Sequence, residues 1–200
     1  MIDHRLELTE KMHLILDIDG TLISENEPII LRPHLQEFLE FCFDLFETVS
    51  IWSAAGQKHV EYIANLILPP GRKWLFVRYS KHCHQTYRSQ LGGIYSEIVM
   101  EKRLRNIWKC QTYRKLGITK FNTLIIDNTP SVCLKNYGNA VYVPSFYTDS
   151  TDQVLLELME YLKILIEVNN VRTVEKRNWR NCGRDCLPSN KIFEKIYYLF

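Results

Sequence analysis

Three short apolar runs in this sequence each end in a polar residue, and this pattern limits the folds available to the chain. The runs are LILD at residues 14–17, TVSIWS at 48–53 and TLIID at 123–127. Short, continuously apolar runs are typical of strands that are covered on both faces, as in parallel sheets. The carboxyl ends of parallel strands meet at one edge, where open α/β sheets bind their ligands. The pattern therefore predicts a parallel sheet with a polar site at one edge.

Segments with apolar residues at helical spacing separate these runs. The expected helices span residues 33–46, 60–67, 104–116 and 154–166. Two more strands are expected at 74–77 and 140–143, with an irregular, basic and aromatic segment over 78–98. Strands that alternate with helices predict an α/β three-layer sandwich, in which helices cover both faces of a central parallel sheet.

The length of the chain sets its organisation. Two hundred residues suffice for one sizeable core and are too few for two comfortable domains. We expect one domain over residues 1–167 and a basic C-terminal extension over 168–200 that docks on it. The extension has seven Lys or Arg and three Asp or Glu, a net charge of +4 in a chain whose total is +2. The end of the extension, KIFEKIYYLF, places its apolar residues on one helical face.

Composition also excludes several classes of protein. No apolar run approaches the length of a membrane span, and the first residues, MIDHRLELTEK, are too charged for a secretory signal. Six cysteines spread over 200 residues are not a disulfide scaffold. We therefore expect reduced, unconnected thiols, no membrane partner and an intracellular location, in the cytoplasm or nucleus.

The first run carries the strongest chemical signal. Asp17 and Asp19 lie two residues apart, so in an extended chain both carboxylates point to the same side. Two carboxylates at such a short distance repel each other unless a cation compensates their charge. Gly20 and Thr21 follow with a turn whose amide and hydroxyl donors could meet an anion. The stretch therefore indicates a metal-dependent phosphate site.

Further motifs connect this stretch to a known family. DIDGTL, WSAA, a lysine before a helix and LIIDN, in that order, resemble the haloacid dehalogenase superfamily of phosphotransferases. RPHLQEFLEFCFDLFETVSIWSAA, FVRYSKHC and NTLIIDNTP followed by NAVYVPSF are similar to one branch of it. That branch contains the RNA polymerase II C-terminal-domain phosphatases and the nuclear LIM interactor (NLI)-interacting factor-like proteins. The resemblance covers about residues 12–165 and implies the Rossmann-like sandwich of the superfamily.

The resemblance also implies the roles of four residues. Asp17 would be the nucleophile that forms an aspartyl-phosphate, which splits a very slow hydrolysis into two easier steps. Asp19 would protonate the leaving oxygen and then activate water. Ser53 and Thr21 would donate hydrogen bonds to the phosphoryl oxygens.

A magnesium ion is the cofactor that the resemblance implies. Hard oxygen ligands suit Mg²⁺, which would neutralise the carboxylate and phosphate charges. Its ligands would be Asp17, the backbone carbonyl of Asp19, and Asp127 or Asn128, directly or through water.

The lysine of the motif set is the hardest residue to assign. In the family it directly precedes a helix, in a pattern like K-x-L-x-x-x-W, which EKRLRNIWK fits when the lysine is Lys102. Its role would be to hold the charge of the phosphoaspartate and of the substrate phosphate. Lys109 is the alternative.

Each of these features also has a plain structural interpretation. An Asp pair after a strand is often only a turn, Ser53 could cap the following helix, and Lys102 could be a solvated surface charge. The residues around Asn128 could likewise cap a helix. Their combination, in order and at strand ends, favours the catalytic interpretation.

The substrate is expected to be a phosphorylated macromolecule. Only ten residues separate Thr21 from Arg32, which leaves no room for a cap domain at that point, so the site is expected to be open and capless. An open site favours phosphoserine or phosphothreonine in proteins. Polymerase-tail phosphatases carry an insert at that point for a proline-recognising pocket, and its absence argues against polymerase-tail specificity.

Two alternatives remain beside a protein phosphatase. The basic tail and the missing insert favour a nucleic-acid 3′-end phosphatase, and the third hypothesis is a binding module that has lost catalysis. Residues 71–88, which are basic and aromatic, are either a substrate-facing surface or a solvated edge of the sheet.

Overall fold

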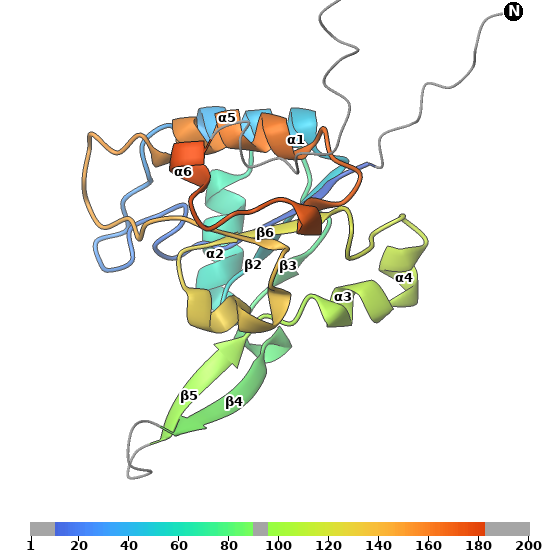
Figure 1. The fold of residues 1–200 in the computed structure, drawn as a ribbon. Helices are drawn as coiled ribbons and strands as arrows, with labels where there is room; N and C mark the ends of the chain where they lie inside the picture. The colour runs from blue at the N-terminus through green and yellow to red at the C-terminus, as the bar shows by residue number, and fades with distance from the viewer. Residues whose placement is uncertain (1–10, 90–95, 183–200) are drawn as a thin grey trace, which may run out of the picture.

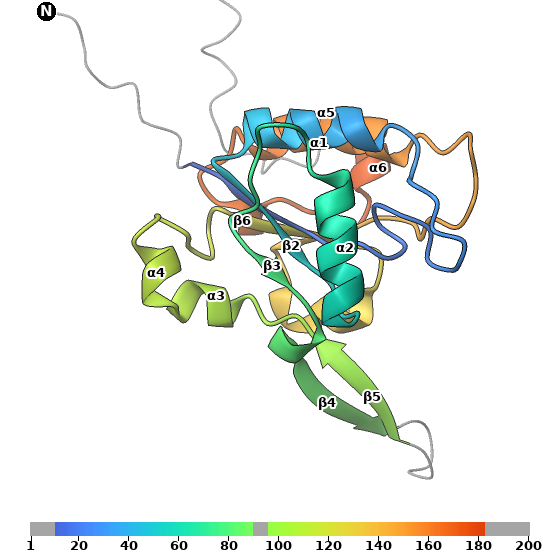
Figure 2. The same ribbon diagram turned by 180° about the vertical axis from the view of Figure 1, so that it is seen from behind.

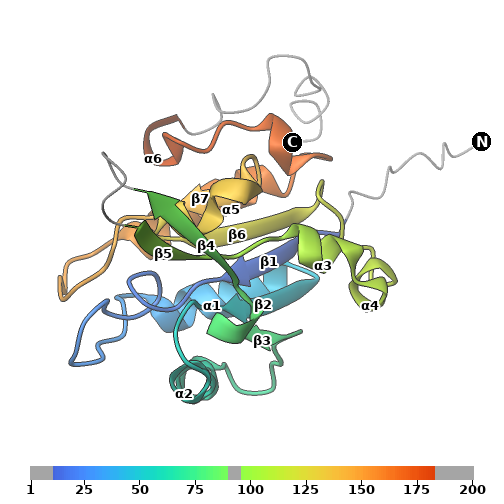
Figure 3. The same ribbon diagram turned by 90° about the horizontal axis from the view of Figure 1, so that it is seen from below.

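A five-stranded parallel sheet forms the centre of the computed structural model, which describes residues 11–89 and 96–182. Its strands lie side by side in the order β3–β2–β1–β6–β7, as Figure 3 shows from below. Every neighbouring pair is parallel. The strands are β1 His13–Leu16, β2 Thr48–Trp52, β3 Val77–Arg78, β6 Thr123–Asp127 and β7 Ala140–Tyr142. The predicted parallel sheet is confirmed.

Helices cover both faces of this sheet. On one face lie α1 (Leu35–Leu45), α2 (Gln57–Ile67) and α5 (Val154–Leu165), with α1 and α5 side by side in Figures 1 and 2. On the other face lie α3 (Arg105–Lys109), α4 (Gln111–Arg114) and the 3₁₀ helix η2 (Pro130–Asn136). Successive strand residues point to opposite faces, so Leu14 and Leu16 join the first core while Ile15 joins the second. The three-layer α/β sandwich is therefore as predicted.

The chain after α5 returns to the first core. The short elements η3 (Val171–Thr173) and α6 (Trp179–Cys182) follow α5, and Val171, Val174 and Trp179 are buried in that core. The indole of Trp179 donates a hydrogen bond to the backbone oxygen of Tyr142 in the edge strand β7 (2.7 Å). The division of the chain at residue 167 stays a prediction, and the apolar helical face predicted over 191–200 lies outside the described residues.

An antiparallel hairpin occupies part of the segment that was expected to be irregular. Its strands β4 (His84–Ser89) and β5 (Ser96–Glu101) project away from the main sheet in Figures 1 and 2, after the 3₁₀ helix η1 (Ser80–His82). Val99 is buried on one face of the hairpin, whereas the cross-strand pair Tyr87 and Ile98 is 67% and 52% exposed on the other. Neither strand alternates polar and apolar residues, so the hairpin was not predicted. The expected turn at residues 92–93 lies outside the described residues.

Two other elements differ from their predicted extent. The strand expected over 74–77 is reduced to β3, because Trp74 turns into the core and its indole donates to the backbone oxygen of Ala64 (3.0 Å). The helix expected over 104–116 is divided into α3 and α4 at Cys110, whose backbone is extended (φ −70°, ψ 121°).

Two exclusions made from composition can be compared with the described residues. Over 11–89 and 96–182, no helix is both long enough and apolar enough to cross a membrane. Cys42, Cys83, Cys110 and Cys133 are free thiols.

Candidate functional site

The carboxyl edge of the sheet brings two predicted aspartates to one lysine. Asp17 follows β1 and Asp127 ends the neighbouring strand β6. The ammonium group of Lys102 lies between them, in contact with Asp17 Oδ1 and 2.7 Å from Asp127 Oδ2. All three residues are buried. A buried charge is tolerated only when it is paired, and here each charge has a partner.

The chain around Lys102 fixes this position. Lys102 directly follows β5, and its backbone N–H donates to the Val132 oxygen (2.8 Å). Asn136 accepts a hydrogen bond from the Leu104 N–H (3.0 Å) and donates one to the Lys102 backbone oxygen. The alternative lysine, Lys109, is exposed on α3.

Burial and pairing act against each other on these groups. Burial raises the pKa of the Asp17 carboxyl above its usual range, Lys102 opposes this rise, and Asp127 adds to it. Burial alone would lower the pKa of the Lys102 ammonium, but the Asp127 and Asp17 carboxylates raise it above its usual value. With all three groups ionised, the cluster carries a net charge of −1. A second cation would therefore be attracted to it.

The turn after β1 orients the nucleophile candidate. Gly20 has a positive φ of 72°, and a side chain there would collide with the Asn128 amide, so the turn requires glycine. The Thr21 hydroxyl donates to Asp17 Oδ2 (3.0 Å), the shorter of its two acceptor contacts, and accepts from the Asn128 N–H (3.1 Å). Thr21 was expected to donate to a phosphoryl oxygen. Its side chain is buried and its one hydrogen faces Asp17, so it orients that carboxylate, and its donation to a phosphoryl oxygen stays a prediction.

Oxygen atoms converge beside Asp17 in a way that fits a cation. One atom of the Asn128 side-chain amide lies 2.8 Å from Ser145 Oγ, a hydroxyl that can donate or accept, and its other atom faces the site. The atom on that side of the amide lies 3.2 Å from Asp17 Oδ2 and 3.1 Å from the backbone oxygen of Asp19. Neighbouring oxygen ligands of Mg²⁺ are separated by about 3 Å, given its short bonds and octahedral geometry. Without a cation, the amide NH₂ faces these oxygens and the amide oxygen accepts from the Ser145 hydroxyl. A 180° rotation of the amide would present its oxygen to a bound cation.

Asp127 contributes to this arrangement differently. Its Oδ1 accepts from the Thr129 N–H (2.8 Å), and its Oδ2 faces Lys102 and the Cys133 thiol. No group of three His, Cys, Asp or Glu side chains suited to a metal occurs in the described part of the chain. A cation here would be held by Asp17, the Asp19 carbonyl and Asn128. Because both oxygens of Asp127 already have these partners, Asp127 would act through water.

Asp19 lies at the outer side of the site with two partners. Its Oδ2 accepts from the Ser53 hydroxyl (2.9 Å), whose oxygen in turn accepts from the Ala55 N–H (3.0 Å). Its Oδ1 lies 2.6 Å from His59 Nε2 in the first turn of α2. His59 was missed from the sequence, although the turn after the β2 motif is expected at this edge of the sheet.

A buried arginine supports the turn from behind, and the sequence did not single it out. Arg32 donates to the Thr21 backbone oxygen (3.0 Å) and makes a two-bond ion pair with Asp152, which precedes α5 (3.0 and 2.8 Å). The Phe146 ring packs against its guanidinium (5.4 Å to the ring centroid). This network fixes the backbone that positions Asp17 and Thr21.

The basic segment over 71–88 does not form one continuous cationic surface. Arg72 is paired with Asp44 and Glu40 of α1, away from the site. Arg78 packs over several aromatic rings, those of Trp52, Phe76 and Tyr113. Part of the segment therefore serves packing, while the substrate-facing surface and the solvated edge both stay predictions.

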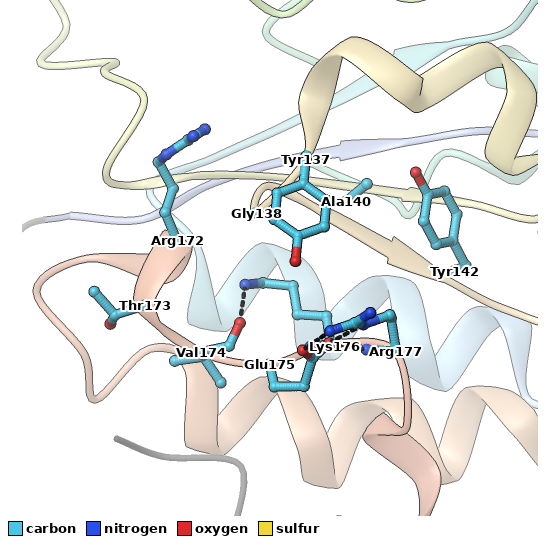
Figure 4. A pocket seen from close by; sticks show the side chains of 10 residues that line it. All are labelled: Tyr137, Gly138, Ala140, Tyr142, Arg172, Thr173, Val174, Glu175, Lys176 and Arg177. Carbon is cyan, nitrogen blue, oxygen red and sulfur yellow. Dashed lines mark hydrogen bonds and ion pairs between the residues drawn. The ribbon is translucent and has the colours of Figure 1, made fainter. Parts of the chain in front are cut away.

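A separate cavity of about 270 Å³ lies between β7 and residues 172–177 (Figure 4). Its polar groups are largely paired with one another: Lys176 donates to the Val174 oxygen (2.8 Å), and Arg177 pairs with Glu175 (2.7 Å). It shares no lining residue with the site around Asp17. These contacts lie within the C-terminal segment, and the Trp179–Tyr142 hydrogen bond joins that segment to the edge strand.

The fold places the chain in the haloacid dehalogenase superfamily. The side-chain arrangement agrees with this assignment; it consists of Asp17, Asp19, Ser53, Lys102 and Asp127. Within it, the sequence profile of the family described as NLI interacting factor-like phosphatase matches residues 12–172. The chain belongs to this family.

Curated relatives are consistent with this membership. A probable C-terminal domain small phosphatase of Dictyostelium discoideum is 27% identical over 165 residues, covering 82% of this chain and 46% of the relative. A CTD nuclear envelope phosphatase 1 homolog of Caenorhabditis elegans is 25% identical over 208 residues, covering 88% and 75%. The chain thus spans less than half the length of the Dictyostelium relative.

A solved structure shares the fold. The structure of Fcp1, described as an essential RNA polymerase II CTD phosphatase, aligns with a TM-score of 0.57 at 15% identity. The alignment covers 82% of this chain and 64% of that one. At this identity the likeness extends to the fold alone.

Proposed function

We propose that this protein is a Mg²⁺-dependent phosphatase that hydrolyses phosphomonoesters through an aspartyl-phosphate on Asp17. One observation carries the proposal: a buried aspartate is held by Lys102 and Thr21, with a second aspartate on Ser53 beside it. Spontaneous hydrolysis of phosphomonoesters is so slow that an enzyme must lower the barrier by roughly 20 kcal/mol. Family membership supports phosphatase activity.

The residues divide the reaction into two steps. In the first, a carboxylate oxygen of Asp17 attacks phosphorus, and Asp19 gives its proton to the leaving oxygen as the P–O bond breaks. In the second, Asp19 takes a proton from water as that water attacks the phosphoaspartate, which restores Asp17. Ser53 donates to a phosphoryl oxygen, and Lys102 stabilises the charge on Asp17 and the phosphate.

Asp17, the Asp19 carbonyl and Asn128 would hold the magnesium ion, with Asp127 reaching it through water. When bound, the ion supplies positive charge that neutralises the carboxylate and phosphate oxygens. The Ser145 hydroxyl can donate or accept, so Asn128 can turn its amide oxygen toward the ion and still bond to Ser145.

The proposed substrate is phosphoserine or phosphothreonine in a protein. The loop between Thr21 and Arg32 is short, and the insertion before Lys102 is a hairpin that projects away from the sheet. With no cap domain among the described residues, the Asp19 side chain stays 30% exposed. An open site of this kind suits a phosphate group on a macromolecule.

The reaction is tested with an aryl phosphate. Hydrolysis should require Mg²⁺, stop in EDTA and be lost in Asp17→Asn. Asp19→Asn should accumulate a labile phosphate on Asp17, seen as a mass gain of one phosphate, because the base for the second step is missing. Metal-independent turnover, or a label on another residue, would contradict the mechanism.

The substrate class needs a separate comparison. We would measure kcat/KM for phosphoserine peptides and for oligonucleotides with a 3′-phosphate at matched concentrations. The proposal expects the peptides to be preferred. A preference for the oligonucleotides would favour the nucleic-acid 3′-end phosphatase, and a pure preparation inert toward all phosphate esters would favour the binding module.

A further inference from the structure

His59, the second partner of Asp19, has no role in the proposed two-step reaction. His59 Nε2 lies 2.6 Å from Asp19 Oδ1, and the Ser53 hydroxyl donates to Asp19 Oδ2 (2.9 Å). We infer that His59 is a positioning residue that holds Oδ1 of Asp19 during turnover and leaves Oδ2 free to transfer the proton. This inference rests on the proposed function and deepens it.

Counting hydrogens shows why Ser53 cannot hold Asp19 throughout the reaction. A serine hydroxyl has one hydrogen to donate. Ser53 uses that hydrogen on Asp19, while its oxygen accepts from the Ala55 N–H (3.0 Å). When Ser53 donates to a phosphoryl oxygen, it must release Asp19. Oδ2 is then free at the moment when a proton has to move.

After that exchange, His59 is the donor that remains on Asp19. Among residues 11–89 and 96–182, Ser53 and His59 are the side chains that bond to its carboxylate. A carboxylate with no fixed partner would rotate and spend less time aligned with the leaving oxygen. Small misplacement of a catalytic group is costly, since alignment supplies much of the rate enhancement.

The fold delivers His59 to this point. It is the third residue of α2, which begins at Gln57 directly after the β2 motif, so its turn lies at the carboxyl edge of the sheet. The side chains of His59 and Asp19 are 34% and 30% exposed. The pair therefore lies at the mouth of the site, where substrate arrives, and His59 can be replaced without opening the core.

The test compares two replacements of His59. His59→Ala removes the bond to Asp19 and should lower kcat for a phosphoserine peptide by about 10–100-fold, with KM nearly unchanged. His59→Gln offers an amide N–H near the position of Nε2 and should keep most of the wild-type kcat. Lys58→Ala, at the exposed neighbouring position of α2, is the matched control and should keep wild-type kinetics.

A double-mutant cycle separates positioning from a general structural effect. If His59 acts through Asp19, His59→Ala should change the residual rate of Asp19→Asn by less than about twofold. Additive losses, an equal fall in His59→Gln, or wild-type kcat in His59→Ala would each overturn the inference while leaving the proposed function intact. A wild-type protein without Asp17-dependent hydrolysis would overturn both.

Discussion

The two ends of strands β1 and β6 hold different kinds of buried polar side chains. At the carboxyl ends, Asp17 and Asp127 both contact the Lys102 ammonium, so the polar groups there are ionisable. At the amino ends, His13 bonds to Thr48 (2.9 Å), and Asn122 bonds to backbone groups. The two sets are separated by four residues in β1 and five in β6, a rise of about 13–17 Å.

The amino end is closed by neutral hydrogen bonds. The Asn122 amide donates to the backbone oxygens of Lys11 (3.0 Å) and Gly117 (2.9 Å), and its oxygen accepts from the Thr119 N–H (2.8 Å) and hydroxyl (2.9 Å). The side chain thus uses both amide hydrogens and its oxygen within the fold. Such a residue stabilises the fold and offers nothing to a ligand.

The difference shows at which end of the sheet this fold buries charged groups and bears their desolvation free energy. Burying a charge costs desolvation free energy even when the charge is paired. At the carboxyl end, two carboxylates face one ammonium group, so the negative charge is not fully balanced. The amino end avoids that cost with neutral groups. Changes at the carboxyl end should therefore alter both chemistry and stability, whereas changes at the amino end should alter stability alone.

The largest effect is expected for Lys102→Met. It leaves Asp17 and Asp127 buried without their cation, so the free energy of unfolding should fall by about 3–5 kcal/mol in EDTA. Loss of the ammonium should also lower kcat by about 10²–10³-fold. Urea unfolding and aryl phosphate kinetics measure the two effects, with Lys109→Met as the exposed lysine control. An unchanged kcat in Lys102→Met would contradict the claim that changes at the carboxyl end alter both chemistry and stability.

A smaller effect, on stability alone, is expected for Asn122→Ala at the amino end. The change leaves several backbone groups without their side-chain partner and should lower the free energy of unfolding by about 2–3 kcal/mol. Because Asn122 lies five strand residues before Asp127, which is level with Asp17, the two sites are about 17 Å apart by strand rise. We therefore expect kcat/KM at neutral pH and moderate temperature to stay at the wild-type value. A fall in kcat of the folded variant would show that the two ends are coupled.

Much of the fold could be predicted because its strands are short apolar runs. The runs at 14–16, 48–52 and 123–127 predicted β1, β2 and β6, since burial on both faces leaves a plain hydrophobic signature. The hairpin was not predicted because one of its faces meets solvent, and the exposed pair Tyr87 and Ile98 interrupts any regular pattern. Tertiary burial of Trp74 likewise shortened β3 in a way that local sequence does not encode.

The site was predictable to the extent that its residues end strands. Asp17, Ser53 and Asp127 could be placed at one edge because parallel strands end together, whereas Lys102 needed the resemblance to a family motif. His59 and Arg32 could not be assigned, because their partners Asp19 and Asp152 are distant in sequence. Hydrogen-bond partners of this kind are fixed by packing, and a histidine or arginine alone does not reveal them.

The smallest effect is expected from the titration of His13 at the amino end. Burial lowers the pKa of His13 from 6.5 to about 4; Glu47 raises it and Lys11 lowers it further. Between these values the unfolded chain binds a proton that the folded chain does not, so the free energy of unfolding should fall as the pH drops from 6.5 toward 4. The loss should be about 2 kcal/mol after allowance for solvent screening.

His13→Asn isolates this contribution, because asparagine can keep a hydrogen bond to Thr48 but does not titrate in this range. Urea unfolding of both proteins at pH 7.5 and pH 4.5 should show a decline in wild type that is steeper than in the variant by roughly that amount. Aryl phosphate hydrolysis at pH 7.5 should be equal in the two proteins, since the ring lies at the end of β1 opposite Asp17. Parallel stability curves would mean that proton uptake at the amino end does not distinguish the folded from the unfolded chain.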